Sequence, residues 1–139
     1  MSEHMPQWVR FALIALAVPQ LATGLWAVID PSGWYDDFPG GGRSWVAVDG
    51  PFNHHLAGDA GAGFLATGVV LALAALWFER RVVQVALITL LAFAIPHFLY
   101  HLNNNALSGS DSAISYGGLA FAVAVPAVVL LLSARRAPA

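Results

Sequence analysis

The chain has 139 residues, of which 58% are hydrophobic and only 10% are charged, and its formal net charge is −2. Soluble domains carry about 25% charged residues, so this composition indicates a membrane protein. Six arginines without a lysine, in a chain of negative net charge, give no basis for nucleic-acid binding. The absence of cysteine excludes disulfides, thiolate metal sites and cysteine nucleophiles.

Four apolar stretches follow along the chain, each near the ~20 residues that a helix needs to cross the hydrocarbon core of a bilayer. They cover approximately residues 8–29, 54–78, 82–102 and 112–134. We therefore predict an all-α fold, a four-helix transmembrane bundle that forms a single integral membrane domain over residues 1–139. The first stretch follows Arg10 as a signal peptide would, but its apolar run continues to Ile29, which is too long for one. We interpret it as a retained span.

The segment between the first two predicted spans, residues 31–52, is a long outer loop. Its sequence, PSGWYDDFPGGGRSWVAVDGPF, is rich in Gly, Pro and aromatic residues and has no helical or strand period. Connections longer than about 12–15 residues are usually functional, so we expect a folded cap over the end of the bundle, with a flexible interfacial loop as the alternative. Arg43 could bind an anionic substrate group there, although pairing with a lipid phosphate or a nearby aspartate is its more ordinary use.

The arginines predict how the bundle is oriented. An even number of spans places both termini on one side, and five of the six arginines flank that side: Arg10, Arg80, Arg81, Arg135 and Arg136. The opposite side carries Arg43 and five aspartates: Asp30, Asp36, Asp37, Asp49 and Asp111. Because basic residues remain on the cytoplasmic side of a membrane, we predict a multi-pass protein of the cell membrane with cytoplasmic termini and residues 31–52 outside.

The second and third predicted spans carry ionisable residues at their outer ends. His55 and Asp59 are four residues apart on the second span, and His97 and His101 are four apart on the third, so each pair shares one helix face. Because the two spans are antiparallel, His55 should lie level with His101, and Asp59 with His97. The second span is also rich in Gly and Ala, which allow neighbouring helices to approach closely. We therefore expect the four side chains to meet at the outer face.

Three hypotheses fit this group of side chains. Three imidazoles and a carboxylate suit a divalent metal, Zn, Fe or Cu, bound by His55, Asp59, His97 and His101. The same residues could instead form a hydrogen-bond network that joins the two spans. Haem b ligated by two of the histidines is a further hypothesis, although the small residues of the second span favour contact too close for a macrocycle. Ionisable groups within a span are costly and usually mark sites or pathways.

The sequence also shows a family resemblance. The pattern GPFNHHLAGDAGAGFLATG followed by PHFLYH resembles a group of small four-span bacterial membrane proteins, loosely DoxX-like in outline. The residues that carry the resemblance are Asn53, His55, Asp59, Gly61, Pro96, His97 and His101. The resemblance implies a four-span membrane fold and no particular activity.

Together these patterns predict an integral membrane protein with a metal site at the outer face. The metal would support chemistry on a lipid or quinone-like molecule, with Asp59 as a ligand or as a base beside a metal-bound water. Alternatively, the protein is a non-enzymatic accessory or scaffold subunit of a membrane-protein partner, or a haem b redox subunit. The sequence leaves open whether it is an enzyme.

Overall fold

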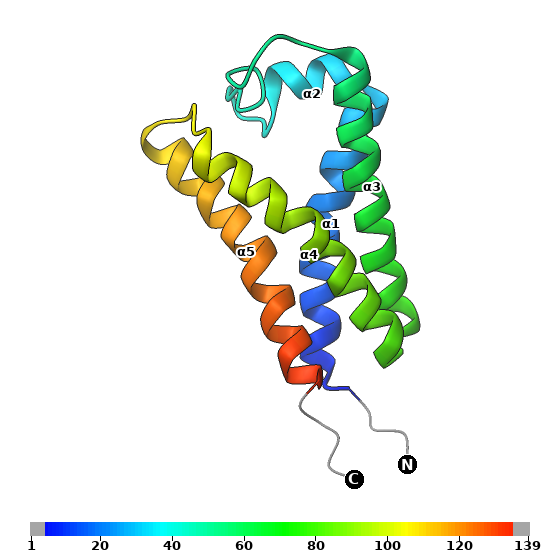
Figure 1. Cartoon of the computed structure of the whole chain (residues 1–139). Coiled ribbons are helices and arrows are strands. Elements are labelled where there is room, and N and C mark those ends of the chain that lie inside the picture. The colour runs from blue at the N-terminus through cyan, green and yellow to red at the C-terminus, as the bar shows by residue number, and fades with distance from the viewer. Residues whose placement is uncertain (1–4, 135–139) are drawn as a thin grey trace.

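The computed structural model describes residues 5–134 as an all-helical chain, as the sequence predicts. Within that range the helices are α1 (Gln7–Ile29), α2 (Pro31–Asp37), α3 (His54–Trp77), α4 (Arg80–Asn103) and α5 (Gly109–Ala134). Four of them are long and apolar enough to cross a membrane, and they correspond to the four predicted spans. The chain is therefore a multi-pass membrane protein. The start of α1 and the end of α5 lie at the same end of the bundle, which we call the base (Figure 1). Helix α2 lies at the opposite end, which we call the cap end.

Helices α1 and α3 pack with their backbones in close contact. A Cβ atom added to Gly61 of α3 would lie 2.8 Å from the Ala27 Cβ and 2.9 Å from the Val28 nitrogen of α1. A Cβ atom on Gly68 would lie 2.8 Å from the backbone nitrogen of Leu21. Small residues permit this approach, because lipid tails are as apolar as the side chains and close packing must hold membrane helices together. The glycines of α3 thus mainly serve contact with α1, and not the contact with α4 that we expected from the sequence.

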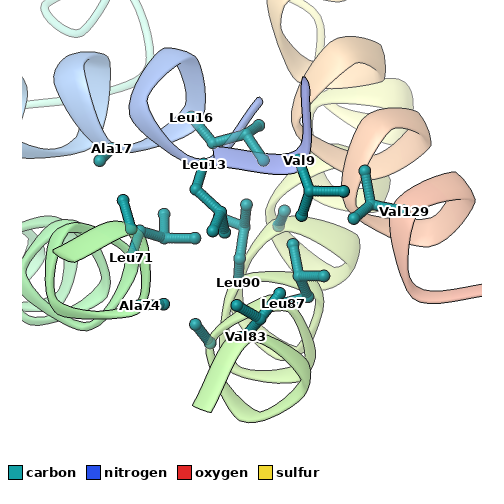
Figure 2. Close-up of a cluster of buried hydrophobic side chains, with 13 residues drawn as sticks. Val9, Leu13, Leu16, Ala17, Leu71, Ala74, Val83, Leu87, Leu90 and Val129 are labelled. Carbon is teal, nitrogen blue, oxygen red and sulfur yellow. The ribbon is translucent and has the colours of Figure 1, made fainter. Parts of the chain in front are cut away.

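The buried core of the bundle lies toward the base. Figure 2 shows side chains from α1, α3, α4 and α5 converging there, among them Leu13, Leu71, Leu87 and Leu90, all with no exposed surface. Val129 of α5 is 2% exposed in the same cluster. These leucines hold the α1–α3 pair against the α4–α5 pair.

Toward the cap end the two helix pairs separate. Ala94 is the last buried residue of α4, and every α4 residue from Ile95 to Asn103 is partly or fully exposed. The buried residues of α5, Pro126 and Val129, both lie in its half nearer the base. Figure 1 accordingly shows α4 and α5 leaning away from α1 and α3 as they approach the cap end. The faces of α4 and α5 are therefore accessible there from the membrane.

The segment between α1 and α3 contains a helix that its sequence did not indicate to us. Helix α2 begins directly after Asp30, whose side chain accepts a hydrogen bond from the Gly33 nitrogen at 2.9 Å, and it has Pro31 in its first turn. An aspartate followed by proline is a typical helix start, so the expectation of no helical structure over residues 31–37 was wrong. After α2, the ring of Phe38 packs between those of Trp34 and Trp45, at centroid distances of 6.0 and 6.1 Å.

Candidate functional site

His97 lies at the contact between the two helix pairs. Its imidazole stacks on Phe93 of the same helix, with a centroid distance of 5.6 Å and an interplanar angle of 16°. The edge of the Phe64 ring of α3 meets both of them, at 5.8 Å from His97 and 4.9 Å from Phe93. Gly63 leaves room for this arrangement, because a Cβ there would lie 3.6 Å from Phe93. The imidazole is thus set among aromatic rings within a membrane-spanning helix.

His101 follows one turn nearer the cap end. Its ring centroid is 4.8 Å from that of His97, with the planes at 78°. The Tyr116 hydroxyl of α5 donates a hydrogen bond to the His101 carbonyl oxygen at 3.1 Å, which ties the end of α4 to its neighbour. His97 is six residues before the last residue of α4, so it lies ~9 Å along the axis from the helix end, at the helical rise of 1.5 Å per residue.

The two imidazoles have polar atoms without internal partners. Among residues 5–134, no side chain or backbone group forms a hydrogen bond or ion pair with the ring nitrogens of His97 or His101. Both side chains are half-buried. Polar groups in a span are expensive unless they are satisfied by water, a neighbouring helix or a ligand. This pair is therefore the strongest candidate site on the described part of the chain.

His55 and Asp59 form a second pair, on the first turns of α3. The His55 Nε2 and Asp59 Oδ2 atoms are 3.3 Å apart, and the two side chains are 83% and 66% exposed. No hydrogen bond, ion pair or ring contact joins either of them to His97 or His101 within residues 5–134. The predicted spacing within each pair is present, but the structure does not bring the pairs together.

The divergence of the helix pairs explains this separation. Ala57 and Gly61 are buried on the side of α3 that packs near α1 and the cap segment, residues 30–52. Asp59 is two residues from each of them, or ~200° around the helix axis, so its side chain points away from α1. It shares a face with Gly63, which lies opposite Phe93 of α4, but it is one turn nearer the cap end, where α4 is no longer buried beyond Ala94. Within residues 5–134, no group of three or more His, Asp or Glu side chains is arranged to hold a metal ion. The four-ligand metal centre thus stays a prediction without geometric support.

The aromatic contacts around His97 were not predicted from the sequence. Phe93, His97 and His101 follow one another at intervals of four residues, so the stacking could have been inferred from the sequence. The Phe64 contact could not, because it depends on the rotation of α3.

Arg43 forms an ion pair with Asp111, with a distance of 2.8 Å between Nε and Oδ1, which confirms pairing with an aspartate as its use. This pair links the cap segment to the first turn of α5. Gln20 of α1 is buried, and its Oε1 atom has no hydrogen-bond partner among residues 5–134.

Comparisons with known proteins do not assign this site. No family model matches the chain, and no curated protein or solved structure is detectably similar to it. The arrangement of side chains therefore carries the functional argument.

Proposed function

We propose that this membrane protein binds a quinone-like molecule at His97 and His101. The ring nitrogens would form hydrogen bonds with the carbonyl oxygens of the ligand, and its apolar tail would lie in the membrane along the exposed part of α4. The observation that carries the proposal is the pair of imidazoles without internal partners, set beside Phe64 and Phe93. An imidazole can donate or accept a hydrogen bond, so the pair suits a ligand that presents oxygen atoms to it.

Access from the membrane supports the proposal. The α4 residues beyond Ala94 are partly or fully exposed, and the two helix pairs diverge at that level (Figure 1). A hydrophobic molecule dissolved in the bilayer can therefore reach the half-buried imidazoles laterally. A polar group that gains a hydrogen-bond partner in an apolar setting offsets a desolvation cost of about 1–3 kcal/mol, which favours an occupied site.

The charges favour a quinone-like molecule over a phospholipid. Phosphate groups are usually bound by Arg or Lys, and the chain contains no lysine. The cap-end arginine, Arg43, is already paired with Asp111. Neutral carbonyl oxygens need no cation, so they fit the groups that are present.

A divalent metal is the second candidate. Two histidines four residues apart on one helix face are a common half of a Zn, Fe or Cu site, and His97 and His101 have this spacing. In this case the remaining ligands would have to come from solvent, substrate or a membrane-protein partner.

The test uses purified protein in detergent and a benzoquinone that carries a decyl tail. Decylbenzene, which lacks the carbonyl oxygens, is the matched control ligand. We expect the parent to bind the quinone, and His97→Phe or His101→Phe to weaken binding by about tenfold, the equivalent of one hydrogen bond. His55→Phe is the matched control variant, because His55 is exposed and separate from the site, and it should bind like the parent.

The same samples distinguish the alternatives. Equal affinity for decylbenzene, or unchanged quinone affinity in both α4 variants, would contradict the proposal. Metal analysis without chelator should find no bound Zn, Fe or Cu that depends on His97. One equivalent of metal lost from both α4 variants would replace the proposal with the metal hypothesis, and a Soret band lost in the same way would replace it with haem b.

A further inference from the structure

A second candidate site lies at the cap end, away from His97. A pocket of ≈ 230 Å³ opens between α2, the chain that leads into α3, and the first turns of α3. Among its lining residues are Trp34, Tyr35, Asp49, Leu56, Ala57 and Ala60. The walls are thus mostly apolar and aromatic, with one charged side chain, and this composition is typical of a site for a small organic ligand.

Hydrogen bonds within the protein hold the pocket in shape. The Tyr35 hydroxyl donates to the Gly50 carbonyl oxygen at 2.6 Å, and the rings of Tyr35 and Phe52 lie 5.2 Å apart. On the other side, the Asn53 side chain accepts a hydrogen bond from the Leu56 nitrogen at 3.1 Å and starts α3. These contacts anchor the chain on the C-terminal side of Asp49, and on its N-terminal side the Trp45 nitrogen donates a hydrogen bond to the Phe38 carbonyl oxygen at 2.8 Å. The pocket therefore does not depend on a ligand to form.

The charges of this region favour a cation. Asp49 accepts no hydrogen bond and forms no ion pair through its carboxylate among residues 5–134. The cap segment, residues 30–52, contains four aspartates and a single basic residue, Arg43. Because Arg43 pairs with Asp111 of α5, it leaves the acidic character of the cap segment largely unbalanced.

From these observations we propose that the cap pocket binds an organic ammonium ion. The carboxylate of Asp49 attracts the positive charge, and the side chains of Trp34 and Tyr35 supply the aromatic rings to which quaternary ammonium groups bind. Leu56, Ala57 and Ala60 contact the apolar carbons of the ligand. The ammonium can belong to a free amine in the aqueous phase or to the head group of a lipid. This site is independent of the quinone-binding proposal.

Binding of choline to the purified full-length protein in lipid-free detergent tests the charge requirement. The control ligand is 3,3-dimethylbutan-1-ol, which has the same shape as choline and no charge. We expect the uncharged molecule to bind at least about tenfold more weakly, because it loses the ion pair and the cation–π attraction. A second arm compares the protein in phosphatidylcholine and phosphatidylglycerol bilayers, with the head group followed by NMR. Binding in the first arm indicates a free amine, and binding confined to phosphatidylcholine indicates a lipid head group.

Matched variants locate the site. Asp49→Asn should lower choline affinity by about tenfold and Asp49→Glu should retain most of it, because the glutamate restores the charge. Asp37→Asn removes an equal charge from an exposed residue outside the pocket, and should leave affinity within about twofold. The proposal fails if the two aspartate-to-asparagine variants lose affinity equally, if the uncharged molecule binds as well as choline, or if neither arm detects binding. Thermal melts of each variant establish that it is folded.

Discussion

Replacing Gly61 with alanine should destabilise the bundle through a single methyl group. The added Cβ would lie 2.8 Å from the Ala27 Cβ and 2.9 Å from the Val28 backbone nitrogen, well inside the 3.4 Å at which ordinary van der Waals contact begins. A backbone atom cannot move aside as a flexible side chain can, so α1 and α3 must separate. Overpacking of this kind costs about 1–3 kcal/mol.

Gly58→Ala provides the matched control on the same helix. A Cβ at Gly58 would have no neighbour within 4 Å, so this variant gains only the higher helix propensity of alanine, about 1 kcal/mol. Both variants share that gain, and the difference between them isolates the contact with α1. We expect Gly61→Ala to be about 1–3 kcal/mol less stable than Gly58→Ala.

Reversible unfolding in mixed micelles of increasing sodium dodecyl sulfate content, followed by far-ultraviolet circular dichroism, measures this difference. Gly24→Ala tests the contact from the other helix, because its Cβ would meet the Leu65 backbone and lie 2.9 Å from the Gly61 carbonyl oxygen. Equal stability of Gly58→Ala and Gly61→Ala would refute the close approach of α1 and α3.

Two further predictions concern the cap end. Tyr35→Phe removes the hydroxyl that donates to the Gly50 carbonyl oxygen at 2.6 Å. Thermal melts should therefore show that the free energy of unfolding falls by about 0.5–1.5 kcal/mol. An unchanged melt would mean that this bond does not anchor the pocket. For the orientation, a reporter fused after Ala139 should be active as a cytoplasmic marker and one inserted near Gly41 as an exported marker, because five of the six arginines flank the spans on the side predicted for the termini. The reverse pattern would invert the topology.

The sequence sufficed for the spans and for contacts within one helix. The predicted stretch 54–78 corresponds to His54–Trp77, because a run of apolar residues long enough to cross a bilayer is a strong signal. The pairing of His55 with Asp59, and of His97 with His101, followed from their spacing of four residues. These features depend only on helix geometry, which is the same in every protein.

Contacts between helices could not be predicted in the same way. The small residues of α3 indicated close packing, but several helices could have been the partner, and Gly61 packs on α1. That choice fixes the rotation of α3, with Gly63 opposite Phe93 of α4 and Asp59 on the same face one turn nearer the cap end. Pro96, two residues after Ala94 inside α4, indicates a bend beside His97, but a proline does not determine the direction in which the helix continues. The predicted four-ligand centre requires α3 and α4 to stay in contact at their cap ends, and the spacing within each pair gives no information on that contact.

The division between the base and the cap end has a consequence for function. Lipid tails solvate apolar side chains as well as a protein core does, so the two helix pairs are held together where side chains interlock closely, around Leu13, Leu87 and Leu90. His97 and Asp49 both lie outside that core. The proposed quinone site is reached from the membrane and the proposed ammonium site from the aqueous side, and the ion pair of Arg43 with Asp111 connects the cap segment to α5. Substitutions of His97 or Asp49 should therefore change ligand affinity with little effect on stability, whereas substitutions of the leucines at the base should do the opposite.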